Sequence, residues 1–153
     1  MYNARIVKES AEATTVTLTA GEAIAKNDFI TLLTDGQAEV TATGKGIFGI
    51  ALESASAAGQ KIKVRRAHPG MVVMMDNDNV STTFASSHVG ARFDITGTSG
   101  AQLVDTSTAA QDGTDAGQLF CIEFNPKGYG FDSDTSIGLF EIAEIQGLTN
   151  ALS

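Results

Sequence analysis

Residues Gly44 to Met75, GKGIFGIALESASAAGQKIKVRRAHPGMVVMM, decide the fold expected for this chain. An apolar run from Ile47 to Leu52 is followed by a turn of small residues and by a segment, Lys61 to Arg65, in which apolar and basic residues alternate. Pro69 and Gly70 then interrupt the chain before a second apolar run. Short runs bounded by glycine, proline and small polar residues predict β-strands, here three of them. None of the three carries a catalytic group.

The middle strand carries a row of basic residues. Because side chains alternate between the faces of a strand, Ile62 and Val64 point to one face, and Lys61, Lys63 and Arg65 point to the other. We interpret these three residues as a basic stripe that docks on an acidic partner; the alternative is a solvated strand face with dispersed charge. Further candidates for the same contact are Lys45, Arg66, Arg5 and Lys8.

The rest of the sequence repeats the pattern of short strands and tight turns. Thr14 to Thr19 alternates as a half-buried strand does, and Asp35-Gly36 is a strong hairpin signal. The last segment, Leu139 to Ile145, fits both a helical and a strand spacing, and we favour a strand because glycines bound it closely. Other strands are expected at 28–33, 37–40, 92–96, 102–107 and 118–124.

These patterns predict an all-β fold, a small antiparallel β-barrel or sandwich of short strands. A weak internal repeat aligns Phe29–Val40 with Phe93–Val104; each copy is a strand, a glycine-centred turn and a strand. The expected core residues are Val16, Leu18, Phe29, Ile50, Leu52, Ile62, Val64, Val72, Phe93, Ile95, Phe120, Ile122 and Phe124.

The N-terminal segment has two interpretations. Residues 1–13 form either an arm that orders against a partner, ahead of a single domain at 14–153, or an edge strand at Ala4 to Lys8 followed by a loop. Only Ile6 and Val7 favour the strand.

Composition excludes several classes of protein. The chain has 153 residues and a net charge of −8, which argues against binding a phosphate backbone. No apolar run approaches the roughly 20 residues that a transmembrane helix needs, and no signal peptide is recognisable. We therefore expect a soluble protein made in the cytoplasm, without nucleic-acid or membrane partners.

No group of residues predicts catalysis or a cofactor. The single cysteine, Cys121, lies between apolar residues and is interpreted as a small core residue. His68 and His88 belong to no nucleophile, metal or acid–base motif. Three acidic clusters, at 76–79, 112–115 and 132–134, lack the register of a calcium loop and are interpreted as turns, with a shared metal at an oligomer axis as the alternative.

Two blocks of the sequence resemble a known family. The first is the apolar strand, small-residue turn and Lys-Ile-Lys-Val strand within Gly44–Met75. The second runs from His88-Val89-Gly90 through a strand, the Thr98-Ser99-Gly100 turn and Gln102–Ser107 to the apolar strand Gln118–Phe124. This layout is similar to that of the small β-barrel head decoration, or cement, proteins of tailed bacteriophages.

The resemblance implies a non-enzymatic virion protein. Such a protein binds the outer surface of the mature icosahedral capsid as a homotrimer, contacts the major capsid protein and stabilises the shell. Two alternatives remain at this point: another virion component, such as a head fibre base or tail barrel, or a carbohydrate-binding module with its site in the polar loops near Thr106 and Asn125. The lack of tryptophan and the presence of only two tyrosines, Tyr2 and Tyr129, argue against a sugar-stacking platform.

Overall fold

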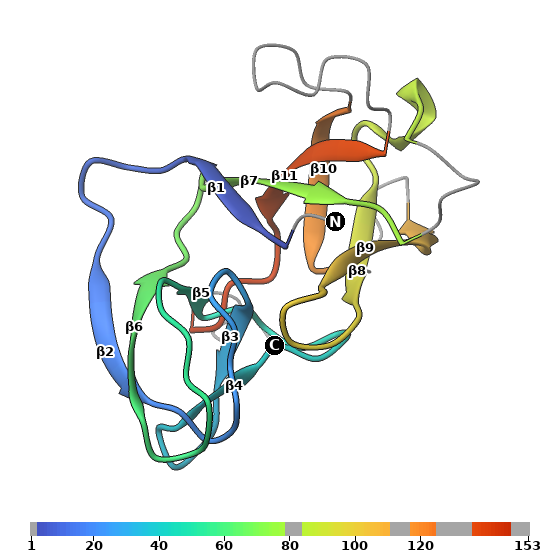
Figure 1. The fold of residues 1–153 in the computed structure, drawn as a ribbon. Helices are drawn as coiled ribbons and strands as arrows, with labels where there is room; N and C mark the ends of the chain where they lie inside the picture. The colour runs from blue at the N-terminus through green and yellow to red at the C-terminus, as the bar shows by residue number, and fades with distance from the viewer. Residues whose placement is uncertain (1–2, 79–83, 111–116, 125–135, 148–153) are drawn as a thin grey trace.

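The computed structural model describes residues 3–78, 84–110, 117–124 and 136–147, which form β-strands and one 3-10 turn (Figure 1). The elements, in chain order, are β1 (Arg5–Lys8), β2 (Thr15–Thr19), β3 (Phe29–Leu32), β4 (Ala38–Val40), β5 (Gly49–Ala51), β6 (Lys61–Arg66), β7 (Val72–Asp76), η1 (Ser86–His88), β8 (Arg92–Thr96), β9 (Leu103–Ala110), β10 (Leu119–Phe124) and β11 (Ile137–Ile142).

The strands form two antiparallel sheets, so the all-β prediction is confirmed. The six-stranded sheet has the order β1-β7-β11-β10-β8-β9, and the five-stranded sheet has the order β2-β6-β5-β3-β4. Of the two architectures expected, the fold is sandwich-like and is not closed into a barrel. The five-stranded sheet nevertheless curls until its two edges meet at a single bridge between Ala20 and Ala38.

The two sheets share one topology. Adding five to each strand number of the order β2-β6-β5-β3-β4 gives β7-β11-β10-β8-β9, which is the six-stranded sheet without β1. The chain therefore consists of a first unit, β2–β6, and a second unit, β7–β11, with β1 added to the edge of the second. The repeat seen in the sequence is the β3–β4 hairpin of one unit and the β8–β9 hairpin of the other. Gly36 and Gly100 both adopt positive φ in these turns, 81° and 76°.

The residue-by-residue alignment of that repeat does not follow the strand pairing. Val40 pairs with Ile30, whereas Val104 pairs with Ile95. Aligning Val40 with Val104 would place Ile30 over Asp94, one residue away from Ile95. The turn of the second hairpin is longer, so the topology is shared while the register differs.

The buried apolar residues form three clusters. One lies within the first unit and includes Ile62 and Val64, on which Val16 and Leu18 pack. The largest joins the units, because Phe29 and Ile50 of the five-stranded sheet pack with the inner face of the six-stranded sheet. The third covers the opposite face of the six-stranded sheet. It contains Val72, Met74, Ile137 and Leu139, with Val7 and Ile122 packed against it.

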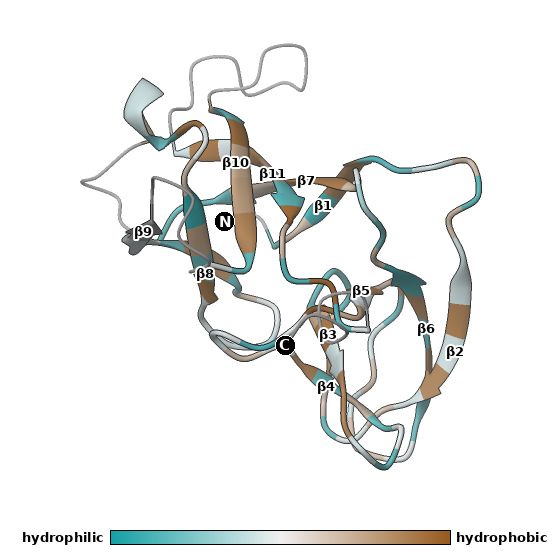
Figure 2. Cartoon of the chain, turned by 180° about the vertical axis from the view of Figure 1, so that it is seen from behind, coloured by the Kyte–Doolittle hydropathy of each residue, from teal (hydrophilic) through white to brown (hydrophobic). Residues whose placement is uncertain are grey.

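The colouring of Figure 2 shows the alternation along β2. Pale and brown bands follow one another on this strand, as expected for a half-buried strand.

Most of the predicted core residues are buried or pack on these clusters, but Phe120 is an error. It is 36% exposed, whereas its neighbours Leu119 and Cys121 are fully buried. A β-bulge between Cys121 and Glu123 shifts the alternation, so that Phe124 returns to the inner face. Leu52 is half-buried and belongs to none of the clusters.

Of the two interpretations of the N-terminal segment, the edge strand is the one observed. β1 pairs antiparallel with β7, Ala4 is fully buried, and Ile6 packs on the largest cluster. At the other end of the chain, β11 confirms the preference for a strand. β9 runs to Ala110, further than expected, and residues 111–116 and 125–135 of the expected loops lie outside the described part.

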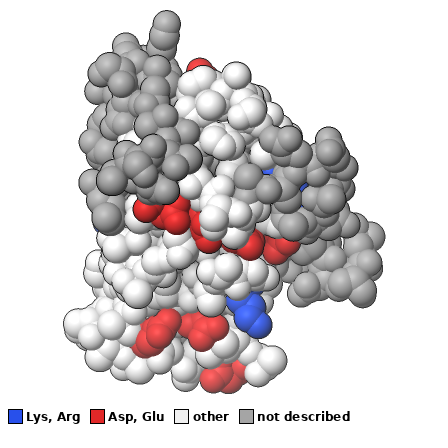
Figure 3. All heavy atoms as spheres, turned by 90° about the vertical axis from the view of Figure 1, so that its right-hand side faces the viewer, with Lys and Arg blue, Asp and Glu red and all other residues white. Residues whose placement is uncertain are grey.

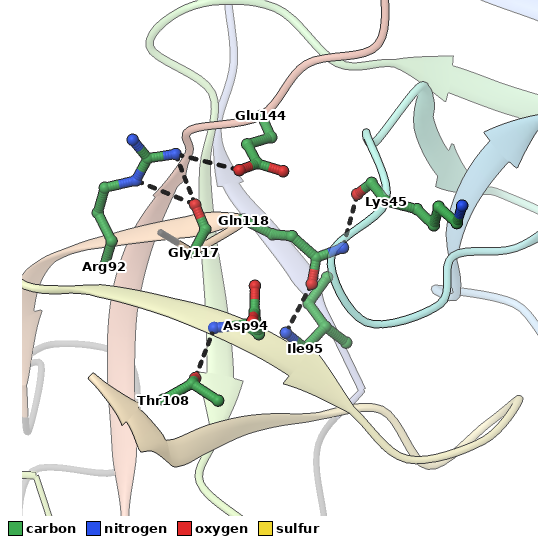
Figure 4. Close-up of polar contacts among 8 residues, drawn as sticks. All are labelled: Lys45, Arg92, Asp94, Ile95, Thr108, Gly117, Gln118 and Glu144. Carbon is green, nitrogen blue, oxygen red and sulfur yellow. Dashed lines mark hydrogen bonds and ion pairs between the residues drawn. The ribbon is translucent and has the colours of Figure 1, made fainter. Parts of the chain in front are cut away.

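Buried polar side chains connect the two units. The Asp28 carboxylate is fully buried and accepts hydrogen bonds from Asn3 Nδ2, the Ala25 amide, Ser99 Oγ and the Gly100 amide. Gln118 accepts a bond from the Ile95 amide and donates to the Lys45 carbonyl (Figure 4). It also donates to the Ala42 carbonyl. Gln102 accepts from the Phe29 amide and donates to the Thr41 carbonyl. Each side chain replaces backbone pairing where the two units meet.

Candidate docking surface

The basic stripe predicted from the sequence lies on β6. Lys61 and Lys63 are exposed and Arg65 is partly exposed, while Ile62 and Val64 between them are fully buried. The stripe, defined as Lys61, Lys63 and Arg65, therefore occupies one face of a strand whose other face is anchored in the core. This arrangement holds the three positive charges on rigid backbone.

The strand next to the stripe is lined with threonine. In the β2–β6 register Thr19 faces Lys61, Thr17 faces Lys63, and Thr15 faces Arg65. The Lys61 ammonium donates a 2.6 Å hydrogen bond to Thr19 Oγ1, so this side chain extends across β2. The surface formed by the stripe and these threonines is uncharged on one strand and basic on the next.

Arg65 at one end of the stripe is partly neutralised. Its Nε lies 3.2 Å from Glu9 Oε2, an ion-pair distance without the orientation of a hydrogen bond, and its Nη1 reaches the Ala13 carbonyl at 3.5 Å. Glu9 follows β1 directly, so the β1–β2 connection packs on this end of the stripe. The sequence carries no signal for this contact, because 56 positions separate the two residues. Lys61 and Lys63 supply the freer charge.

Arg66 does not widen the stripe. Alternation places it on the other face of β6, where its guanidinium lies 4.8 Å from the centre of the Phe48 ring in a cation–π contact. Lys45 is exposed in the connection before β5, and its carbonyl accepts from Gln118 (Figure 4). Arg66 and Lys45 therefore contact other parts of the protein than the stripe residues do.

Arg5 and Lys8 lie at the two ends of β1 in the other sheet, and both are exposed. Lys8 precedes Glu9, which contacts Arg65, so the structure brings this end of β1 towards the stripe. Arg5 is three residues further back, about 10 Å along an extended strand. Of the two, Lys8 is the better placed to act with the stripe.

The face of the molecule drawn in Figure 3 carries mainly acidic charge among its coloured residues. Figure 3 views the molecule from the right-hand side of Figure 1, whereas β2 and β6 lie on the left there. The stripe is a row of three basic side chains in a chain whose net charge is −8.

A surface hollow of about 370 Å³ lies beside the Arg65 end of the stripe, between the β1–β2 and β6–β7 connections. His68 forms part of its wall: its Nε2 accepts from the Ser10 amide at 3.2 Å, and its Nδ1 lies 3.0 Å from the Pro69 carbonyl. The Ser10 contact ties the two connections together, and the Pro69 contact lies within the β6–β7 connection itself. The lining residues are Ser10, Glu12, Ala13, Thr14, Arg66, Ala67, His68 and Pro69.

The other reactive side chains among the described residues are buried or make contacts within the fold. Burial raises the pKa of the Cys121 thiol to about 11, so it is a neutral core group as predicted. His88 Nδ1 accepts from the Ala85 amide, and its ring packs against Phe93. In the first acidic cluster Asp78 accepts from both the amide and hydroxyl of Thr106.

The other two acidic clusters, within 112–115 and 132–134, lie outside the described residues. Elsewhere, no three His, Cys, Asp or Glu side chains gather as a metal site, within the ranges that the structure describes. Nor does any helix in this part of the chain have the length and apolar character needed to cross a bilayer.

No protein-family model matches the sequence, and the search of curated proteins finds no match.

Proposed function

We propose that this chain is a non-enzymatic structural protein of a phage virion, which binds the outer surface of the mature capsid and stabilises it. The observation that carries the proposal is the stripe: fixed positive charges on the exposed face of a core-anchored strand, on a protein that is otherwise acidic. The resemblance of the two sequence blocks to head decoration proteins supplies the class of partner. The major capsid protein is then the partner, through an acidic part of its outer surface.

Stabilisation follows from differential binding. A protein that binds the assembled mature lattice, and not its separated subunits, stabilises the lattice by about 2.7 kcal/mol per site when its free concentration is 100 times the Kd. Many such sites repeat over an icosahedral shell, so modest contacts suffice. A homotrimer at local threefold positions, as the resemblance implies, would add the contacts of three stripes to each attachment.

The test reverses the charge of the two free stripe residues. Lys61→Glu with Lys63→Glu leaves the Arg65–Glu9 pair in place and changes only exposed side chains. Co-sedimentation with mature capsids that lack this protein is expected to show about tenfold weaker binding, roughly 1.4 kcal/mol, with a smaller salt dependence than the wild type has.

Lys26→Glu is the matched control, because Lys26 is an exposed lysine of the β2–β3 connection and is not part of the stripe. It is expected to bind capsids as the wild type does. Wild-type protein that fails to bind capsids and to raise their melting temperature would refute the proposed function. Normal binding by a folded double variant would remove the stripe from it.

A further inference from the structure

The outer edge of β2 is open. The Arg66 amide donates to the Thr14 carbonyl, and the Ala20 amide donates to the Gln60 carbonyl. Hydrogen-bonded pairs in an antiparallel ladder alternate, so Val16 and Leu18 also direct their backbone groups towards β6. The backbone groups of Thr15, Thr17 and Thr19 therefore point away from the sheet. Thr19 flanks the Ala20–Ala38 bridge to β4, so within the described residues the open part of this edge is Thr15 and Thr17.

The other three sheet edges are protected. On β4, the Gly21 amide donates to the Ala38 carbonyl, and Glu22 accepts from the Val40 amide. On β9, Asp78 accepts from the Thr106 amide. β1 is interrupted by a bulge and has a charged residue at each end. β2 has neither a charge, a proline nor a bulge, the features that normally keep an edge from pairing.

The second unit shows what occupies the equivalent edge. β7 is the counterpart of β2, and its outer edge carries β1 as an antiparallel strand. Met74 corresponds to Thr17 in this comparison: each lies at the centre of its strand, and each directs its backbone outwards. Met74 pairs with Arg5 of β1, whereas Thr17 has no such partner. The fold thus already contains one instance of a strand added at this position.

The side chains around the two edges differ and define the chemistry of the missing strand. Beside β1, the face formed by Met74 and Leu139 is apolar, and Val7 of β1 packs on it. On the first unit the same face carries Thr17 and Lys63, within the threonine row and the basic stripe. An added strand that covers this face would complement its lysine if it carried Asp or Glu where β1 carries Val7. The other face of the added strand would cover the half-buried Val16 and Leu18, so apolar residues suit that face.

We propose that the open edge of β2 receives an extended, antiparallel segment of a partner protein in which Asp or Glu alternates with apolar residues. Backbone hydrogen bonds to Thr15 and Thr17 supply affinity, and the stripe selects the acidic face. The inference rests on the proposed function for the identity of the partner, an acidic strand on the capsid surface.

Two variants of Thr17 separate backbone pairing from side-chain contact. Thr17→Pro removes an outward N–H that makes no bond within the sheet, and an edge strand tolerates proline there. Thr17→Val keeps the N–H and the β-branched shape. Thermal unfolding confirms that both variants are folded. Thr17→Pro is expected to weaken capsid binding by about tenfold or more, while Thr17→Val binds as the wild type does.

A second experiment, with a peptide as the probe, tests the inference without the capsid. The probe is the peptide Glu-Val-Glu-Val-Glu, compared with Lys-Val-Lys-Val-Lys and with the glutamate peptide N-methylated on its pairing edge. Hydrogen exchange by NMR is expected to show that only the unmodified glutamate peptide slows the amides of Thr15 and Thr17, by about tenfold or more at saturation. The amides of Val16 and Leu18 are already protected and serve as internal controls.

Each outcome decides the inference. Capsid binding that is equal in wild type and Thr17→Pro overturns the strand addition but leaves the proposed function standing. A peptide that protects the two threonine amides, with no capsid binding by the wild type, supports the open edge and refutes the capsid role. Failure of the glutamate peptide to protect these amides overturns the inference. So does a wild-type dimer that Thr17→Pro converts to monomer, because a second copy would then occupy the edge.

Discussion

At the scale of single residues, buried polar side chains hold the two units together. Asp28 is a buried carboxylate with four hydrogen-bond donors, drawn from the N-terminal segment, its own turn and the β8–β9 turn. A buried charge is tolerated when donors of this kind replace its hydration. Gln102 and Gln118 do the same for backbone groups between the units.

Replacing Asp28 with alanine is expected to destabilise the protein strongly. Asp28→Ala leaves the Gly100 amide and other buried donors without an acceptor, at a cost of about 3 kcal/mol in the free energy of unfolding. Asp35→Ala is the control, since Asp35 is exposed and accepts a single bond, from the Gln37 amide. Urea denaturation measures both. A similar, small loss for the two variants would show that Asp28 does not hold the units together.

At the scale of elements, local periodicity predicted most strands and the face of the stripe, because alternation along a strand needs no knowledge of the rest of the chain. Arg66, a further candidate for the same contact, does not extend the stripe, because the same alternation places it on the opposite face. Phe120 was misplaced because a bulge breaks the period of two. The contact of Glu9 with Arg65 and the pairing of β1 with β7 depend on long-range packing. No local pattern encodes them.

The position of β1 changes what its removal should do. Deleting residues 1–8 takes away the buried Ala4, the packing of Ile6 and the strand that covers β7. The deletion is expected to lower the melting temperature and to cause self-association, because it uncovers a second unprotected edge. Arg5→Ala with Lys8→Ala keeps the β1 backbone and is expected to stay monodisperse and close to wild-type stability. Light scattering and thermal unfolding distinguish the two; a deletion variant as stable as the wild type would make β1 a dispensable arm.

At the scale of the whole molecule, two units of one topology have different outer faces. In the second unit that face is apolar and is covered partly by β1; in the first it is basic and threonine-rich, and its edge is open. The two units contact each other through buried residues. Phe29 and Ile50 of the first unit lie in the cluster formed by the second, and Ile47 donates to the Glu144 carbonyl. This shared core holds the stripe and the open edge in a fixed position relative to the rest of the molecule.

The shared core predicts that the two units unfold together. Phe140→Ala empties a fully buried site in the second unit and is expected to cost about 4 kcal/mol. The Ile62 and Val64 amides lie on β6 of the first unit. If unfolding is cooperative, the free energy of opening that hydrogen exchange measures at these amides should fall by the same amount. Leu33→Ala, at a 39% exposed residue of the first unit, should change these rates little. Unaltered exchange on β6 in Phe140→Ala, or two separate calorimetric transitions, would instead show that each unit folds alone and that Asp28, Gln102 and Gln118 only dock them.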